Sequence, residues 1–94
     1  MTVGLLTLEL FLPASVSLKD KRKVLSSLQA RLRGRHNLAI AEVGNQDLWQ
    51  RASLAVVSVG AHRDPIERMF DDVLAEAERT VPGQVLSADR EFFG

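Results

Sequence analysis

A dense group of cations between positions 19 and 35 is the strongest chemical signal in this sequence. The segment holds seven basic residues against one acid, Asp20, which gives it a net charge of +6. Lysine and arginine side chains bind the phosphates of nucleic acids, and this binding weakens as salt rises. The segment therefore predicts contact with a polyanion, and the alternative is an ordinary solvated surface whose charges are balanced by acids elsewhere. The basic residues are Lys19, Lys21, Arg22, Lys23, Arg31, Arg33 and Arg35.

A second candidate is the run NQDLWQR at residues 45–51, which carries the only tryptophan, Trp49, and an arginine two positions later, Arg51. Two residues apart on an extended strand, these side chains share a face. An exposed tryptophan beside a guanidinium can stack a nucleic-acid base, whereas a buried one packs into the edge of a core or a subunit contact. The expected contact residues for nucleic acid or another anion are Lys19, Lys21, Arg22, Lys23, Arg33, Trp49 and Arg51.

The start of the first predicted helix, near Lys19 and Lys21, is a third candidate. Free backbone N–H groups at a helix start can hold a small anion, and two lysines there would assist it. The alternative is that both lysine side chains extend into water. This position is the only one where we consider an enzyme that acts on a small anion.

No set of residues for catalysis, metal binding or a cofactor is recognisable. The chain has no cysteine and only two histidines, His36 and His62, which are too few for a zinc site. Asp71 and Asp72 are adjacent on a predicted helix and cannot flank one substrate. Neither a phosphate loop nor a dinucleotide fingerprint is present. We therefore expect no catalytic residues, no metal, no cofactor and a non-enzymatic role.

Apolar periodicity predicts the elements that position these residues. The even positions of the first strand carry the core residues, and leucines at helical spacing form the first helix, which Gly34 closes in the left-handed conformation. The order βαββαβ with right-handed crossovers predicts a single α+β domain over residues 1–94, ferredoxin-like, with a four-stranded antiparallel sheet and two helices on one face. The start of the first helix and the hairpin turn should meet at one end. The predicted strands are 2–12, 37–43, 48–59 and 84–92, and the predicted helices are 18–33 and 64–81.

The sheet face without helices should expose Val3, Leu5 and Phe11, which predicts a homodimer or another protein partner on that face. The first strand begins without a basic leader and carries Glu9 within its apolar stretch, so it reads neither as a signal peptide nor as a membrane span. Together with the absence of cysteine, this favours a cytoplasmic protein with no membrane partner.

Several stretches together resemble the YlxP-like family of uncharacterised bacterial proteins, over nearly the whole chain. They are VGLLTLEL, SLKDKRKVLSSLQARLR, AEVGNQDLWQRASLAVVSV and the closing strand. The resemblance implies a ferredoxin-like fold. Genes of this family often lie near those for translation initiation and small-subunit maturation, which implies association with RNA or ribosomal particles. The turn at Gly44 and Asn45 departs from the more polar turn that family members often carry.

The leading expectation is a small binding module that contacts RNA or a ribosomal subunit through its basic first helix. The alternative is a homodimeric protein-interaction scaffold that uses the open sheet face.

Overall fold

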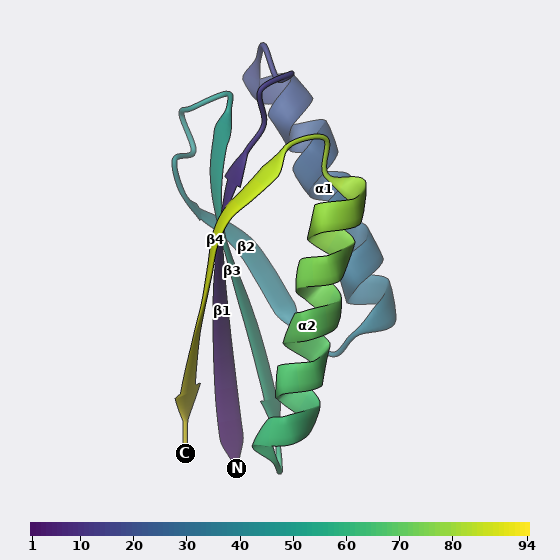
Figure 1. The fold of residues 1–94 in the computed structure, drawn as a ribbon, viewed down its shortest axis with the longest axis vertical. Coiled ribbons are helices and arrows are strands. Elements are labelled where there is room, and N and C mark those ends of the chain that lie inside the picture. Colours follow the sequence, from purple (N-terminus) through teal and green to yellow (C-terminus); the bar gives the residue numbers. More distant parts are fainter.

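The computed structural model describes residues 1–94, and its elements follow the order βαββαβ. The strands form one antiparallel sheet in the order β2-β3-β1-β4, and both helices lie on one side of it (Figure 1). The ferredoxin-like arrangement expected from the sequence is thereby confirmed. The elements are β1 (Thr2–Phe11), α1 (Leu18–Arg35), β2 (Ala39–Gly44), β3 (Arg51–Gly60), α2 (Arg63–Thr80) and β4 (Gln84–Phe93).

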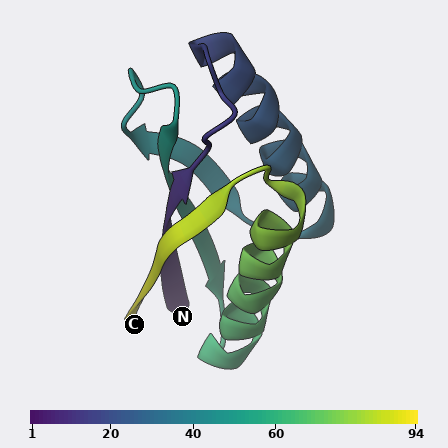
Figure 2. The same ribbon diagram turned by 45° about the horizontal axis from the view of Figure 1, so that its top comes forward.

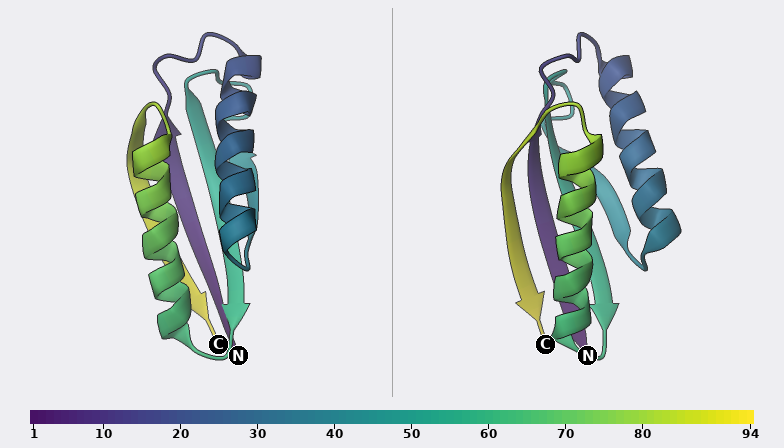
Figure 3. Two further views of the ribbon diagram at one scale, coloured as in Figure 1. Left: turned by 90° about the vertical axis from the view of Figure 1, so that its right-hand side faces the viewer. Right: turned by 45° about the vertical axis from the view of Figure 1, so that its right-hand side comes forward.

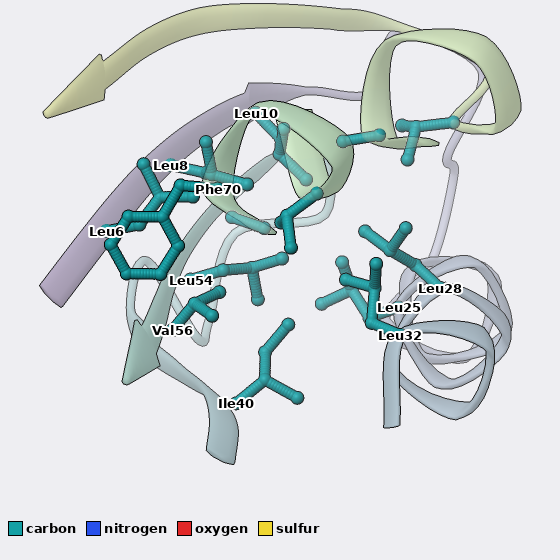
Figure 4. Close-up of a cluster of buried hydrophobic side chains, with 14 of the residues drawn as sticks. Leu6, Leu8, Leu10, Leu25, Leu28, Leu32, Ile40, Leu54, Val56 and Phe70 are labelled. Carbon is teal, nitrogen blue, oxygen red and sulfur yellow. The ribbon is translucent and has the colours of Figure 1, made fainter. Parts of the chain in front are cut away.

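The core lies between the sheet and the two helices (Figure 4). Alternate residues of β1 are buried, from Leu6 to Leu12, as a strand with one covered face requires. Both helices contribute to this core on the same face of the sheet: α1 through its leucines, and α2 through Phe70, which packs over β1. The prediction that the even positions of β1 face the core is confirmed. Neither helix combines the length and apolar character that crossing a membrane requires.

Helix α2 approaches β1 at a glycine. A Cβ atom on Gly4 would lie 2.6 Å from Cγ2 of Ile66, so any larger residue would push the helix from the sheet. Arg90 of β4 ties the other edge of α2 down with hydrogen bonds to Glu67 and Asp71. Partial burial lowers the pKa of Arg90, but the hydrogen bonds and charges of the two carboxylates outweigh it and raise that pKa above its usual value.

Two predicted boundaries are wrong. Gly34 does not close α1 in a left-handed conformation, because the helix continues through it to Arg35, and the N–H of His36 still reaches the carbonyl of Leu32. Strand β3 begins at Arg51 instead of residue 48, because residues 45–50 form a loop that Asn45 enters with a φ of 58°. Trp49 therefore lies in a loop and does not share a strand face with Arg51.

Candidate nucleic-acid interface

The first turn of α1 is capped by its own side chains. Oγ of Ser17 accepts a hydrogen bond from the N–H of Asp20 at 3.1 Å, and Oδ2 of Asp20 accepts one from the N–H of Val16 at 3.1 Å. The bond to Ser17 is one half of a capping box, but the carboxylate of Asp20 accepts from the N–H of Val16, one residue before the N-cap, and not from the N–H of Ser17. The negative charge of Asp20 in the first turn disfavours a bound anion there.

Lys21 is buried, with 1% of its surface exposed. Its Nζ donates to the carbonyls of Asn45, Gln46 and Arg51 at 2.9, 3.2 and 3.3 Å, and it lies 2.7 Å from Oε2 of Glu42. The expectation that Lys21 binds an external anion is therefore wrong, since all its donors point into the protein. We call this arrangement the Lys21 clamp, because it ties the loop 45–50 to α1.

The sequence did contain a signal for the clamp. Lys21 completes the spacing of Leu18, Leu25, Leu28 and Leu32, with steps of three, four, three and four residues, so it falls on the buried stripe of α1. Glu42 lies two residues after the buried Ile40 on β2, which places its side chain on the same covered face. A charged residue at a core position of each element indicates a buried ion pair.

Most of the other basic residues of α1 remain available. Lys19, Arg22 and Lys23 are exposed and form no ion pair or hydrogen bond within the protein, and Nη2 of Arg33 donates only to the carbonyl of Ile40 at 3.0 Å. Lys19, Arg22 and Lys23 lie on the solvent-facing side of α1, as the helical spacing predicts, whereas Arg33 is exposed but reaches the edge strand β2 through its bond to Ile40. We call Lys19, Arg22, Lys23 and Arg33 the cation stripe.

Only some of the basic segment is neutralised by acids. Lys21 pairs with Glu42, and Arg35 pairs with Glu76 at 2.7 Å. In α2, Glu67 pairs with Arg63 and Arg90, Asp71 with Arg90, and Glu76 also with Arg79, and no acid of α2 pairs with the cation stripe. The alternative of a basic face balanced by neighbouring acids therefore holds for two residues of the segment and not for the stripe.

Trp49 is exposed, with 53% of its surface accessible, in the loop between β2 and β3. The neighbouring Leu48 is 49% exposed, so the loop presents two large apolar groups to solvent. Arg51 is half-buried, and its Nε is buried without a hydrogen-bond partner. Trp49 and Arg51 line one shallow depression despite lying in different elements. We call it the Trp49 hollow; its lining residues are Asp47, Leu48, Trp49, Gln50 and Arg51.

The clamp places the Trp49 hollow beside the beginning of the cation stripe. Lys21 lies between Lys19 and Arg22 in α1 and bonds both ends of the loop that holds Trp49. The loop and the start of α1 accordingly occupy the same end of the molecule (Figure 2), as expected from the topology. An exposed aromatic group and unpaired cations thus occur at one end of the molecule.

The sheet face opposite the helices is uncovered (Figure 1). Val3, Leu5 and Phe11 of β1 lie on this face as expected, but they are half-buried and not exposed as the sequence had predicted. The register places Val57 opposite Leu5, and Val59 and Phe93 on either side of Val3. We call Val3, Leu5, Val57, Val59 and Phe93 the open-face patch.

Towards the other end of this face the surface is polar. Nδ2 of Asn45 donates to Oγ of Ser53 at 2.9 Å, and that hydroxyl donates to Oε2 of Glu9 at 2.5 Å. The open face is thus apolar at the start of β1 and hydrogen-bonded at its middle.

Comparison with known proteins assigns the chain to a family. Residues 3–90 match the model of a family described as a protein of unknown function, DUF503. The chain belongs to this family. It is 35% identical over 85 residues to the uncharacterized protein YlxP of Bacillus subtilis (strain 168), an alignment that covers 84% of this chain and 92% of the relative. The resemblance seen in the sequence is thereby confirmed.

Solved structures support the fold of this DUF503 member. A cofactor-independent oxygenase, SnoaB from Streptomyces nogalater, superposes with a TM-score of 0.56 at 10% identity, over 99% of this chain and 91% of that one. A structural-genomics protein, YJCS, gives a TM-score of 0.55 at 8% identity, over 95% of this chain and 96% of that one. At such identities the likeness concerns the fold alone.

Proposed function

We propose that this DUF503 protein is a non-enzymatic module that binds RNA, free or in ribosomal particles, through the cation stripe and the Trp49 hollow. The main support for the proposal is the Lys21 clamp, which holds the loop of the Trp49 hollow to the helix that carries the cation stripe. The clamp uses one lysine internally and leaves Lys19 and Arg22 unpaired beside an exposed Trp49. Such a role belongs in the cytoplasm, where the sequence led us to expect the protein.

The dimensions and charges suit a backbone ligand. Lys19 and Arg33 are fourteen positions apart, which at 1.5 Å per residue makes the stripe about 21 Å long. Four phosphate contacts predict a slope of roughly −3 for log affinity against log salt on a single strand. Stacking on Trp49 adds about 1 to 3 kcal/mol per base, or roughly 5- to 150-fold in affinity. The cations would supply affinity for any RNA, and Trp49 would select unpaired bases.

Fluorescence anisotropy with labelled ribosomal RNA fragments and a homopolymer of equal length tests this proposal. We expect Arg22→Glu to weaken binding and to make the salt slope shallower by about 0.7 or more. Arg68→Glu is the matched control, because Arg68 is exposed and unpaired on α2 and carries the same charge change. Trp49→Ala should lose roughly 5- to 150-fold in affinity for single strands, and Trp49→Phe should retain most of it.

Two results would refute the RNA proposal. One is binding that does not respond to salt. The other is an equal loss of affinity in Arg22→Glu and Arg68→Glu, which would show that only the total charge of the protein matters.

We propose that a second copy of the chain packs on the open-face patch. Val59 and Phe93 are 51% and 53% exposed there, more than side chains on a covered face would be. Three strands of ten residues and one of six, at about 3.3 Å per residue and about 4.8 Å between strands, give a face of about 570 Å² per copy, or about 1,100 Å² in a dimer. That total exceeds the roughly 1,000 Å² expected of a biological interface.

Analytical ultracentrifugation over a range of concentrations tests the dimer. Val59→Lys should shift the protein to monomer, because it would place an unpaired cation in the apolar part of the interface. Val16→Lys is the control, since Val16 is 68% exposed in the loop before α1, away from the sheet face. A wild-type monomer at every concentration would end this second proposal, and so would an unchanged dimer in Val59→Lys.

A further inference from the structure

A separate depression lies between the two helices, which run side by side on the sheet (Figure 3). It has a volume of about 240 Å³, and none of its lining residues is acidic. We call it the helix hollow; it is lined by Lys23, Val24, Ser27, Leu28 and Arg31 of α1, and by Thr80 and Pro82 at the end of α2 and the following turn.

Three polar side chains of α1 in this hollow have no partner within the protein. Lys23, Ser27 and Arg31 follow one another at four-residue steps, about 6 Å apart along the helix axis. Neither cation forms an ion pair, and the hydroxyl of Ser27 forms no hydrogen bond with another residue. Lys23 and Arg31 are about 12 Å apart along the axis, so their long side chains can approach one anion from either side of Ser27.

The acids of α2 do not neutralise this hollow. Glu76 is the buried carboxylate of the last turns of α2, and its two oxygens are occupied by Arg35 and Arg79, each at 2.7 Å. The hydroxyl of Thr80 donates to the carbonyl of Glu76 and so leaves only its oxygen lone pairs free. The cations that face the hollow therefore lack a counterion in the protein.

We propose that the helix hollow binds a phosphate monoester, with Lys23 and Arg31 on its oxygens and the hydroxyl of Ser27 donating to it. Its volume lies below the range of about 300 to 1,000 Å³ that is typical of small-molecule sites. A phosphate group fits inside while the rest of the ligand stays outside. The phosphate has two possible sources, a free nucleotide or the end of an RNA strand. The site goes beyond the RNA surface proposed above and shares only Lys23 with it.

Amide chemical shifts in a ¹⁵N-labelled sample, followed during titration, test the site. The probes are inorganic phosphate, adenosine monophosphate, and an RNA oligomer with either a 5′-phosphate or a 5′-hydroxyl group, each against an equal concentration of chloride. We expect shifts centred on residues 23–31 and on Thr80. Saturation by the two small probes would identify a free ligand, and shifts by the 5′-phosphorylated RNA alone would identify a strand end.

Variants separate this site from the RNA surface. The double variant Ser27→Ala with Arg31→Gln removes two hydrogen bonds to a charged ligand and should lower the affinity for phosphate by about tenfold or more. Arg22→Gln is the control, because Arg22 does not line the helix hollow. It should weaken RNA binding and leave the affinity for inorganic phosphate and adenosine monophosphate unchanged. The proposal is overturned if no probe shifts residues 23–31 at millimolar concentration, or if both variants lose phosphate affinity equally.

Discussion

Replacing Lys21 by methionine should destabilise the protein strongly, although it removes a charge from the buried interior. Methionine fills much the same space, but it leaves three carbonyls without their donor and the carboxylate of Glu42 without its counter-charge. Removing one partner of a buried ion pair costs about 3 to 5 kcal/mol. Glu42 keeps 20% of its side chain exposed, so water can solvate it in part, and the expected loss is near about 3 kcal/mol. The total free energy of unfolding of a domain of this size is roughly 5 to 14 kcal/mol.

Urea unfolding followed by far-ultraviolet circular dichroism and by tryptophan fluorescence measures this loss. Trp49 lies in the loop that the clamp holds, so in Lys21→Met its fluorescence should change at a lower urea concentration than the circular dichroism signal. Lys19→Met is the control. Lys19 is exposed and unpaired, so this change should alter the free energy of unfolding by no more than about 0.5 kcal/mol.

A double-mutant cycle isolates the ion pair. Once Lys21 is methionine, Glu42→Gln should cost little more stability, because the carboxylate that it replaces has already lost its cation. The coupling energy between the two positions should be about 1 to 3 kcal/mol. The reasoning fails if Lys21→Met costs no more than Lys19→Met, or if the two changes at Lys21 and Glu42 are additive.

Four further substitutions, at three positions, test the packing of α2 and the stability of α1. Gly4→Ala should cost about 1 to 3 kcal/mol, because its Cβ would lie 2.6 Å from Cγ2 of Ile66; an unfolding midpoint in urea equal to wild type would contradict this. Gly34→Ala should gain about 0.5 to 1 kcal/mol in the same assay, since it lies inside α1 with nothing within 4 Å, and a loss would show strain there. Ser17→Ala should lose about 1 kcal/mol with the cap, whereas Ser17→Asp should keep it.

Much of the fold could be read from local patterns. The alternation from Gly4 to Leu12 identified β1 and its covered face, and the order of elements with the handedness of their connections led to the sheet. Helix and strand ends were less certain, because the end of α1 and the start of β3 depend on contacts that lie far apart in the sequence. Nothing local distinguishes Gly34 as a helix residue from Gly34 as a cap. The register of β3 depends in part on Lys21, thirty positions before Arg51.

The amino-acid sequence by itself determined that cations crowd into α1 and that four of them, Lys19, Arg22, Lys23 and Arg33, share the face away from the leucines, because helical spacing alone sorts side chains by direction. Only the tertiary structure decided which cations stay available. Burial and ion pairing depend on what other elements bring near: β2 and the loop 45–50 enclose Lys21, and α2 brings Glu76 to Arg35. Trp49 lies in the same loop and stays exposed, because Lys21 binds only the backbone of the loop.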